Sequence, residues 1–228
     1  MKRAICLLLL LSTLLFAQQA AAPAVPIDRE PMHHLFLEND VVRVFKVEVP
    51  AGGRTLLHQH DRDYLFITLG DSDVTNARQG EPARELKLKE GDMAYTKGGF
   101  AHVAINNAKT PFRNVTIEIV KPAPDANAAP SQTLAGAGMS VTFMVENARA
   151  HAELDELEPG ATTPQHSHKL AHLAVALNDM TLENDVVGKG KATTTRKAGD
   201  VAWVEGGYTH TFKNLGKTAA RWAVIEIK

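Results

Sequence analysis

Cysteine is almost missing from this chain of 228 residues, in which Cys6 is the only one. It lies inside an apolar run near the N-terminus, so the rest of the chain has no thiol for a disulfide, a nucleophile or a thiolate metal ligand. The stability of the fold must therefore come from its hydrophobic cores. A metal site in this chain would have to be built from nitrogen and oxygen ligands.

Excess charge of either sign is also missing. Lys and Arg total 25 and Asp and Glu total 26, which gives a net charge of −1. We expect no nucleic-acid partner and no binding to an anionic membrane, because both need a surplus of positive charge. The sequence also contains no Walker, dinucleotide-binding or G-x-S-x-G motif, which argues against those classes of enzyme.

Residues 1–22 have the composition of a secretory signal peptide. Two basic residues precede a Leu-rich apolar run, and a stretch of small residues follows it. The run is short for a membrane-spanning helix, although an uncleaved anchor is the alternative. We expect a periplasmic or secreted protein that has no membrane attachment after cleavage. Cleavage is expected after Ala17, Ala20 or Ala22.

Helical periodicity is absent over any segment longer than two turns, and the remaining sequence is typical of strands. Residues 41–49, for example, are rich in Val with polar residues interleaved, which predicts a half-buried strand. The glycine-containing stretch 50–53 predicts the turn that follows. Short strands with turns marked by glycine predict an all-β fold of the sandwich or barrel type.

The chain contains an internal repeat with an offset of 108 residues, the separation between His58 and His166. We therefore predict two similar domains, 23–121 and 139–228, joined by a linker at 122–138 that is rich in Pro, Ala and Gly. The residues of the first copy are Gly52, His58, His60, Gly91, Gly99, His102 and Asn106. They recur as Gly160, His166, His168, Gly199, Gly207, His210 and Asn214.

The repeated histidines have the spacing of metal ligands on strands. Side chains alternate between the two faces of a strand, so His58, His60 and Tyr64 share one face. His102 follows a Gly-Gly turn, and a neighbouring strand could bring it beside the first pair. Converging imidazoles suit a divalent transition metal, with Fe, Zn, Cu, Ni or Mn as candidates. For any single histidine, the alternative is a polar residue on a sheet whose hydrogen bonds are satisfied. The second copy offers His166, His168, His172 and His210.

These motifs resemble those of the cupin superfamily, G-x5-H-x-H-x3-4-E-x6-G and G-x5-P-x-G-x2-H-x3-N. The resemblance covers both halves and is that of a bicupin. It implies two tandem double-stranded β-helix (jelly-roll) barrels. It also implies metal ligands at His58, His60 and His102 in the first half, and at His166, His168 and His210 in the second.

Both halves depart from the cupin pattern at the glutamate ligand, which is replaced by Tyr64 and His172. The motif proline is replaced as well, by Lys97 and Glu205. Without the anionic ligand, a hard manganese site is disfavoured. The chain resembles instead the three-His and four-His cupins, which include iron dioxygenases of thiols and diketones, so iron is the first metal expected. Tyr64 can line the cavity, hydrogen-bond near the metal, or act as a weak ligand.

Other residues give weaker signals. Glu118 and Glu226 recur at the same offset and are candidates for a general base, although alternation along a final strand favours outward-facing polar residues. His33 and His34 fall in the expected lead-in and are expected to be solvated. His151 has no motif around it.

The function predicted from these observations is that of an exported, metal-dependent oxidoreductase of the dioxygenase type, acting on a small organic molecule. The alternative is a metal-containing protein that binds a sugar or an organic acid without turnover. A metal-dependent isomerase is a third option. A homodimer is compatible with either reading.

Overall fold

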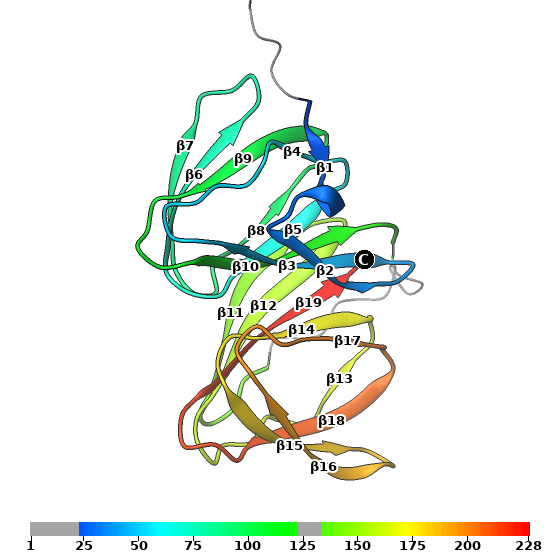
Figure 1. The fold of residues 1–228 in the computed structure, drawn as a ribbon. Helices are drawn as coiled ribbons and strands as arrows, with labels where there is room; N and C mark the ends of the chain where they lie inside the picture. Colours follow the sequence, from blue (N-terminus) through cyan, green and yellow to red (C-terminus); the bar gives the residue numbers. More distant parts are fainter. Residues whose placement is uncertain (1–22, 123–133) are drawn as a thin grey trace, which may run out of the picture.

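The computed structural model describes residues 23–122 and 134–228, which form two β-barrels (Figure 1). The expected signal peptide lies outside the described residues, and so does most of the expected linker. Among the residues described, one 3-10 turn, η1 (Ile27–Arg29), is the only helical element, and all other regular structure is β-strand. No helix in this part of the chain is long and apolar enough to cross a membrane.

The first barrel is made of two five-stranded sheets with the orders β1-β4-β9-β6-β7 and β2-β3-β10-β5-β8. Its strands are β1 (Val25–Pro26), β2 (His33–Glu38), β3 (Val42–Val49), β4 (His58–His60), β5 (Tyr64–Thr68), β6 (Ser72–Arg78), β7 (Arg84–Leu88), β8 (Met93–Thr96), β9 (Phe100–Asn106) and β10 (Phe112–Ile119). Except for the parallel pair β1 and β4, its strands pair antiparallel.

The second barrel repeats this arrangement with sheets of order β11-β12-β19-β14-β17 and β13-β18-β15-β16. Its strands are β11 (Met139–Glu146), β12 (Ala150–Leu157), β13 (His166–His168), β14 (His172–Ala176), β15 (Met180–Val186), β16 (Gly190–Arg196), β17 (Val201–Val204), β18 (Tyr208–Asn214) and β19 (Ala220–Ile227). Strands β12 to β15 and β17 to β19 each begin 108 residues after their counterparts in the first barrel. The predicted repeat of two all-β barrels is therefore confirmed.

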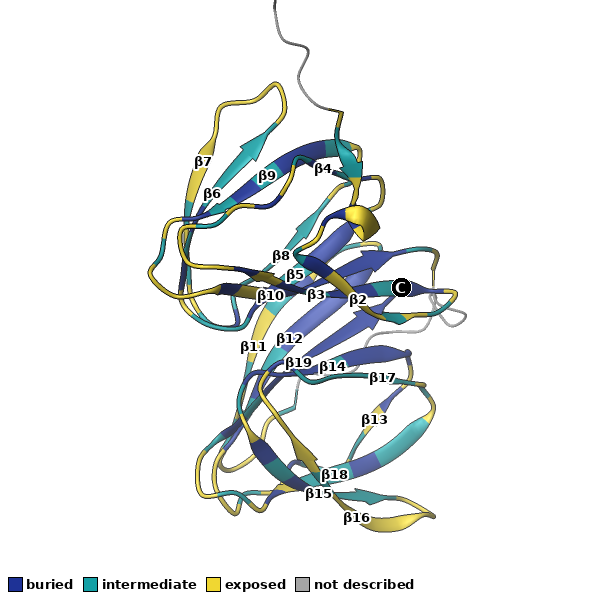
Figure 2. Ribbon diagram, viewed as in Figure 1, coloured by how far each residue is buried: buried dark blue, intermediate teal, exposed yellow. Residues whose placement is uncertain are grey.

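The two barrels share one hydrophobic core. The sheet that contains β3 and β10 packs against the sheet that contains β12 and β19, and Figure 2 shows these strands as the most buried of the molecule. Val44 and Ile117 of the first barrel belong to the same buried cluster as Ala152 and Ile225 of the second. Burial of this shared surface is expected to stabilise both barrels together, because each would expose apolar area alone.

The shared core corrects the prediction of a half-buried strand over residues 41–49. Val44 points to the neighbouring barrel, whereas Phe45 and Val47 belong to a separate core inside the first barrel. All three side chains are at most 4% exposed. The strand is therefore buried on both faces, which alternation of polar and apolar residues did not indicate.

Close turns place the strands that carry the later histidines. A Cβ atom on Gly98 would fall 2.5 Å from the carbonyl carbon of Arg62, so only glycine fits this approach. Gly206 meets the backbone of Lys169 and Leu170 in the same way. Asp92 caps the turn at Gly91, since its carboxylate accepts a hydrogen bond of 2.7 Å from the backbone of Lys89.

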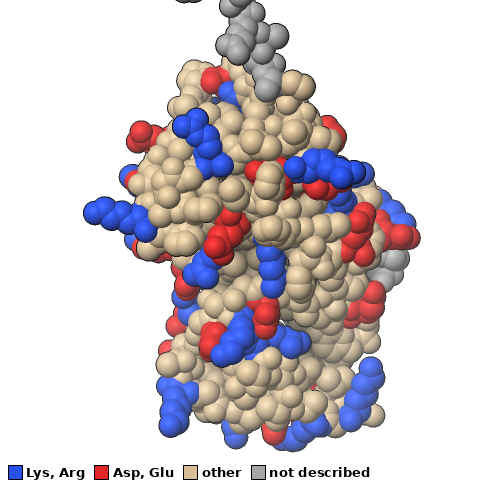
Figure 3. Space-filling view, viewed as in Figure 1, with Lys and Arg blue, Asp and Glu red and all other residues tan. Residues whose placement is uncertain are grey.

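Charged side chains are distributed over the visible face of the molecule with both signs mixed (Figure 3). Several form exposed pairs across strands, such as Lys191 with Glu183 at 2.7 Å and Lys197 with Asp179 at 2.6 Å. Exposed pairs of this kind contribute little stability, about 0–1 kcal/mol each. This face carries no extended patch of one sign that would suit a polyanionic partner.

Candidate metal centres and cavity

Strand pairing brings the predicted histidines together in each barrel. β4 pairs with β9 so that His58 lies opposite His102, and β13 pairs with β18 so that His166 lies opposite His210. The ring centroids are 4.4 Å apart in the first pair and 4.3 Å apart in the second. The second histidine of each H-x-H motif, His60 in the first barrel and His168 in the second, adds a third ring to its cluster.

Hydrogen bonds to the outer nitrogens orient these rings. The Nδ1 atom of His58 donates to the carbonyl of Leu56 at 2.9 Å, and that of His102 to the side-chain oxygen of Asn76 at 2.8 Å. The second barrel repeats both bonds, from His166 to Pro164 and from His210 to Asn184, each at 2.8 Å. Donation from Nδ1 leaves the Nε2 lone pair directed away from these partners, as metal-ligating histidines require.

Several of these nitrogen atoms are buried without a hydrogen-bond partner. Within the described part of the chain, this holds for Nε2 of His58, Nδ1 of His60 and Nε2 of His210. A buried polar atom that is left unsatisfied costs about 1–3 kcal/mol. Imidazole nitrogens that converge in this state fit a metal ion, which would satisfy them through their lone pairs.

Burial also keeps the histidines neutral. Desolvation lowers the pKa of His58 to about 4, with a smaller contribution from His33, and lowers the pKa of His102 and His210 to about 3. The pKa of His60 is lowered for the same reason. Near neutral pH these rings therefore hold a free lone pair and need not lose a proton when a metal binds.

In the second barrel the predicted ligands form a triad with one further histidine beside it. Ligand nitrogens of His166, His168 and His210 all lie within 4.8 Å of one another. The carboxylate of Glu226 is 3.6 Å from Nδ1 of His168. His172 lies against His168, with ring centroids 4.3 Å apart, and its Nε2 is 3.4 Å from the Tyr208 hydroxyl. His172 therefore lines the site but stands outside the triad.

A cavity of about 490 Å³ opens beside this triad. Its walls are mostly apolar and include Met180, Leu182 and Trp222. The polar residues of the wall include Asp155, which is 5% exposed and whose Oδ1 atom has no hydrogen-bond partner among the described residues. Burial, with the neighbouring Glu153 carboxylate, raises the pKa of Asp155 well above its ordinary value. Its carboxyl group can therefore donate as well as accept a hydrogen bond.

The first barrel is filled more tightly, with a cavity of about 70 Å³. Tyr64 lines this cavity and stacks on His60 with ring centroids 4.3 Å apart. Burial raises the pKa of the Tyr64 phenol to about 12, so the side chain is neutral and is a poor metal ligand. Phe66 and Val47 occupy more of the interior.

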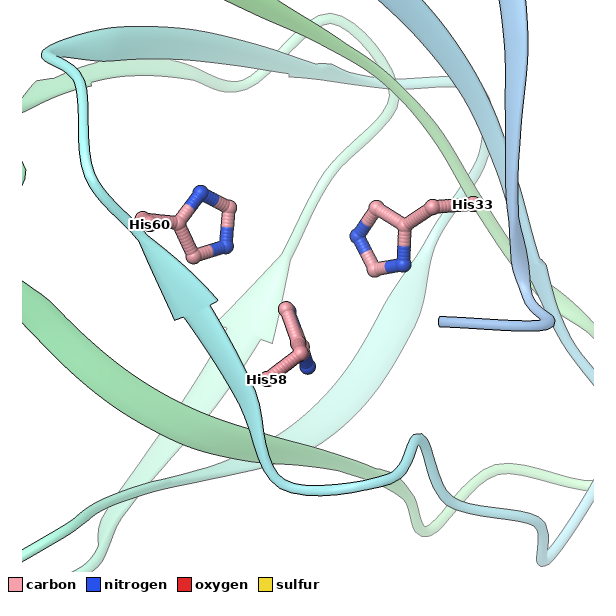
Figure 4. Close-up of side chains that lie close together, drawn as sticks. All are labelled: His33, His58 and His60. Carbon is pink, nitrogen blue, oxygen red and sulfur yellow. The ribbon is translucent and has the colours of Figure 1, made fainter. Parts of the chain in front are cut away.

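The expectation that His33 is a solvated lead-in residue is wrong. His33 begins β2, is 9% exposed, and its ring centroid lies 4.6 Å from that of His58. Figure 4 shows His33, His58 and His60 facing one another inside the barrel, and their ligand nitrogens lie within 4.8 Å of one another. His34, the next residue, is exposed. Sequence reasoning missed His33 because position 141, its counterpart in the repeat, is a valine.

The expectation of outward-facing Glu118 and Glu226 is also wrong. Their exposures are 1% and 0%, because β10 and β19 are covered on both faces. Glu118 forms ion pairs with Arg43 at 3.0 Å and Arg62 at 3.7 Å, and burial raises its pKa. His151, which belongs to no motif, is buried, and its Nε2 atom lies 3.8 Å from Oε2 of Glu153.

Comparison with solved structures places this architecture among known folds. No protein-family model matches the sequence, and no curated protein matches it. A cupin 2 conserved barrel domain protein from Leptotrichia buccalis is similar over 86% of this chain and 88% of its own, with a TM-score of 0.55 and 11% identity. AerE from Microcystis aeruginosa is similar over 87% and 98%, with a TM-score of 0.60 and 12% identity.

Salicylate 1,2-dioxygenase from Pseudaminobacter salicylatoxidans is similar over 88% of this chain and 77% of its own, with a TM-score of 0.62 and 10% identity. Another structure of this enzyme contains gentisate. At these identities the likeness concerns the fold. The chain therefore has the cupin fold, in the form of two tandem double-stranded β-helix barrels.

Proposed function

We propose that the second barrel is a metal-dependent oxidoreductase of the dioxygenase type that acts on a small organic molecule. The observation that carries the proposal is the position of the triad His166, His168 and His210 at a cavity of about 490 Å³. This volume lies within the range of about 300–1,000 Å³ typical of small-molecule sites. The first barrel offers similar histidines, but the cavity beside them measures only about 70 Å³.

The three imidazoles of the triad would hold a divalent transition metal, with iron as the first candidate and Zn, Cu, Ni or Mn as alternatives. When bound, such an ion supplies Lewis acidity and, in the case of iron, redox chemistry at coordination positions that the protein leaves open. The outer hydrogen bonds from His166 to Pro164 and from His210 to Asn184 fix the rings for this task.

The cavity walls support selection of a largely apolar molecule with few polar groups. Met180, Leu182 and Trp222 present apolar side chains to the space beside the triad. Asp155 faces this space with an unpaired carboxyl oxygen, so it can hydrogen-bond one polar group of a bound molecule. His172 and the Tyr208 hydroxyl form a second polar point beside His168.

The fold of salicylate 1,2-dioxygenase gives this proposal an analogy, since that enzyme shares the two-barrel architecture and is seen with gentisate. Fold does not determine function, so the analogy supports the reaction class and leaves the substrate open. The cavity and triad of this chain carry the argument.

Oxygen uptake by iron-loaded protein tests the proposal, with a panel of diketones, flavonols, thiols and hydroxylated aromatic acids as substrates. We expect consumption with at least one class, and its loss by more than about a hundredfold in His210→Ala, since even loss of an outer-shell partner costs 10–100-fold. His34→Ala, an exposed change, is the matched control. Substrate-dependent uptake that survives unchanged in His210→Ala would refute the assignment.

The alternative is a metal-containing binding protein without turnover. The observation that favours it is the enclosed, mainly apolar cavity, which can bind a small molecule whether or not it reacts. Ligands that raise the melting temperature of the metal-loaded protein without oxygen uptake, product formation or isomerisation would support this alternative over the enzyme.

We also propose that the protein is exported and that residues 1–22 are removed. The sequence pattern of this segment supports the proposal. Intact mass of the protein recovered from an expressing cell tests it: a mass that begins after Ala17, Ala20 or Ala22 is expected, and the full-length mass in all fractions would contradict it.

A further inference from the structure

We propose that the first barrel holds an imidazole-preferring divalent metal ion in a closed site, with His33 as a ligand alongside His58, His60 and His102. In this site the ion links the two sheets of the barrel and has a structural role. The inference does not rest on the proposed function, because it concerns the other barrel and depends on His33, which has no histidine counterpart in the second barrel.

The first observation that supports this site is the position of His33. Its side chain lies inside the barrel, and its ligand nitrogen is within 4.8 Å of those of His58 and His60. His102 completes the cluster, since its Nε2 is 3.1 Å from Nε2 of His60. Bonds of about 2.0–2.1 Å to one ion place ligand nitrogens at most about 4 Å apart, so small shifts would bring the four rings to it.

The second observation is that Glu30 orients His33. Its Oε2 atom accepts hydrogen bonds from Nδ1 of His33 at 2.6 Å and from the backbone of Met32 at 2.8 Å. Its Oε1 atom accepts one from the backbone of Leu56 at 3.1 Å. The carboxylate is 2% exposed. A buried carboxylate on Nδ1 leaves Nε2 to ligate and is the usual outer partner of a metal-bound histidine.

The Glu30 carboxylate links two of the proposed metal ligands, His33 and His58, through hydrogen bonds. Leu56 donates its backbone N–H to Glu30 and accepts, at its carbonyl, the Nδ1 hydrogen bond of His58 at 2.9 Å. Glu30 therefore positions both the strand that carries His33 and the loop that leads to His58. Such a chain of outer contacts is expected of a preorganised site rather than of a chance contact between rings.

The topology and the space around the cluster indicate a structural role. His33 lies on β2 in one sheet, whereas β4 and β9, which carry the other three histidines, belong to the opposite sheet. An ion bound to all four would cross-link the two sheets. The cavity of about 70 Å³ has little room for a substrate, and closed four-ligand sites are typical of structural metals.

Counting bound zinc tests the inference on the full chain. After loading with Zn²⁺ and removal of excess metal, we expect two zinc ions per chain, one per barrel. His210→Ala should keep only the ion of the first barrel. In that background, His33→Ala should weaken Zn²⁺ binding by more than about a hundredfold, beyond the 10–100-fold typical of an outer-shell change, whereas the exposed control His34→Ala should leave it unchanged.

The outcomes separate the two proposals. Unchanged zinc affinity of the first barrel in His33→Ala would overturn the role of His33 and leave the second barrel unaffected. A single zinc ion in the wild type that disappears in His210→Ala would overturn the first-barrel site alone. Zinc retained only by the first barrel would support this inference and contradict the proposed function.

Glu30→Gln tests the positioning residue and serves if His33→Ala fails to fold. It should weaken Zn²⁺ binding by about 10–100-fold while the far-UV circular dichroism of the metal-free protein is unchanged. With Co²⁺ in the His210→Ala background, loss of His33 should change the visible d–d absorption, since the number of ligands changes. An identical Co²⁺ spectrum with and without His33 would contradict its ligation.

Discussion

The two barrels keep the same histidines in the same strands and differ in what surrounds them. Val47 and Phe66 help to fill the first barrel to a cavity of about 70 Å³, while Asp155 and Ala174 stand at the equivalent positions of a cavity of about 490 Å³. The outer hydrogen bonds on the first and last histidines of the motifs are the same in both. A ligand frame can therefore be retained while the walls decide whether a substrate fits.

The buried glutamates Glu118 and Glu226 occupy equivalent places in the repeat and also differ in their neighbours. In the first barrel Glu118 forms ion pairs with Arg43 and Arg62. In the second barrel His151 and Leu170 stand at those two positions, and Glu226 lies 3.6 Å from His168. Replacement of the two arginines thus changes which residue lies beside the glutamate, although the glutamate keeps its place in the repeat.

The largest expected effect on ligand binding comes from placing a cavity-wall residue of the first barrel at the equivalent position of the second. Ala174→Phe, which introduces the residue found at position 66, should weaken small-molecule binding by about 10–100-fold, because the added ring would occupy part of the cavity that the ligand needs. Zinc stoichiometry should remain at the wild-type value because the ligands are untouched. Calorimetric titration with a ligand found in the substrate panel gives the affinity.

The matched change Phe66→Ala should enlarge the cavity of the first barrel and lower its stability, by less than the loss of about 3–5 kcal/mol typical of a fully buried Phe, since Phe66 is half-buried. If Ala174→Phe binds the ligand as tightly as the wild type, the second cavity is not the binding site.

The second prediction concerns Asp155, which has Val47 as its counterpart. Asp155→Val should raise the free energy of unfolding of the metal-free protein at pH 7, because removal of a buried carboxyl group whose Oδ1 atom lacks a partner outweighs the loss of its hydrogen bond with Trp222. The same change should weaken ligand binding, because the polar point on the cavity wall is lost. Urea denaturation and calorimetry measure the two effects, and a variant that is less stable than the wild type would contradict this account of Asp155.

The third prediction is a loss of stability in acid for the metal-free protein. Burial holds the pKa of His58 and His172 at about 4 and that of His102 and His210 at about 3, whereas histidine in the unfolded chain titrates near about 6.5. Between these values the unfolded state binds more protons, so the free energy of unfolding falls as pH decreases from about 6.5 to 4.

Denaturation curves in a chelating buffer at several pH values measure this dependence. Metal loading should raise stability at neutral pH, where the imidazoles are neutral, and the gain should disappear in acid as protons compete for the lone pairs. Stability that is constant or rises as the pH decreases through this window would contradict the burial of neutral imidazoles.

The smallest expected effect is that of Tyr64→Phe. The phenol stacks on His60 and is neutral, since burial raises its pKa to about 12. The variant should therefore keep the zinc of the first barrel and change stability by only about 1 kcal/mol, the value of one hydrogen bond. Loss of zinc from the first barrel alone, measured by metal analysis, would show that Tyr64 is a ligand.

Much of the architecture could be predicted from the repeat, because turn glycines and paired histidines mark strand order directly. His58 and His102 followed from parity and from the turn at Gly98 and Gly99. His33 could not be predicted in this way, because it enters the cluster through the packing of β2, which has no histidine in the second copy. The inward orientation of Glu118 depends on a barrel contact that covers the strand on its other face, and alternation along one strand carries no information about that contact.

The central claim, that both barrels hold a metal ion and only the second has space for a small molecule beside that ion, is tested most directly by diffraction from metal-loaded crystals. Anomalous difference maps collected at the zinc edge should contain two peaks, one among His33, His58, His60 and His102 and one among His166, His168 and His210. A soaked ligand should add density beside the second peak alone. Absence of a peak at the second triad, or a ligand bound in the first barrel, would contradict the account.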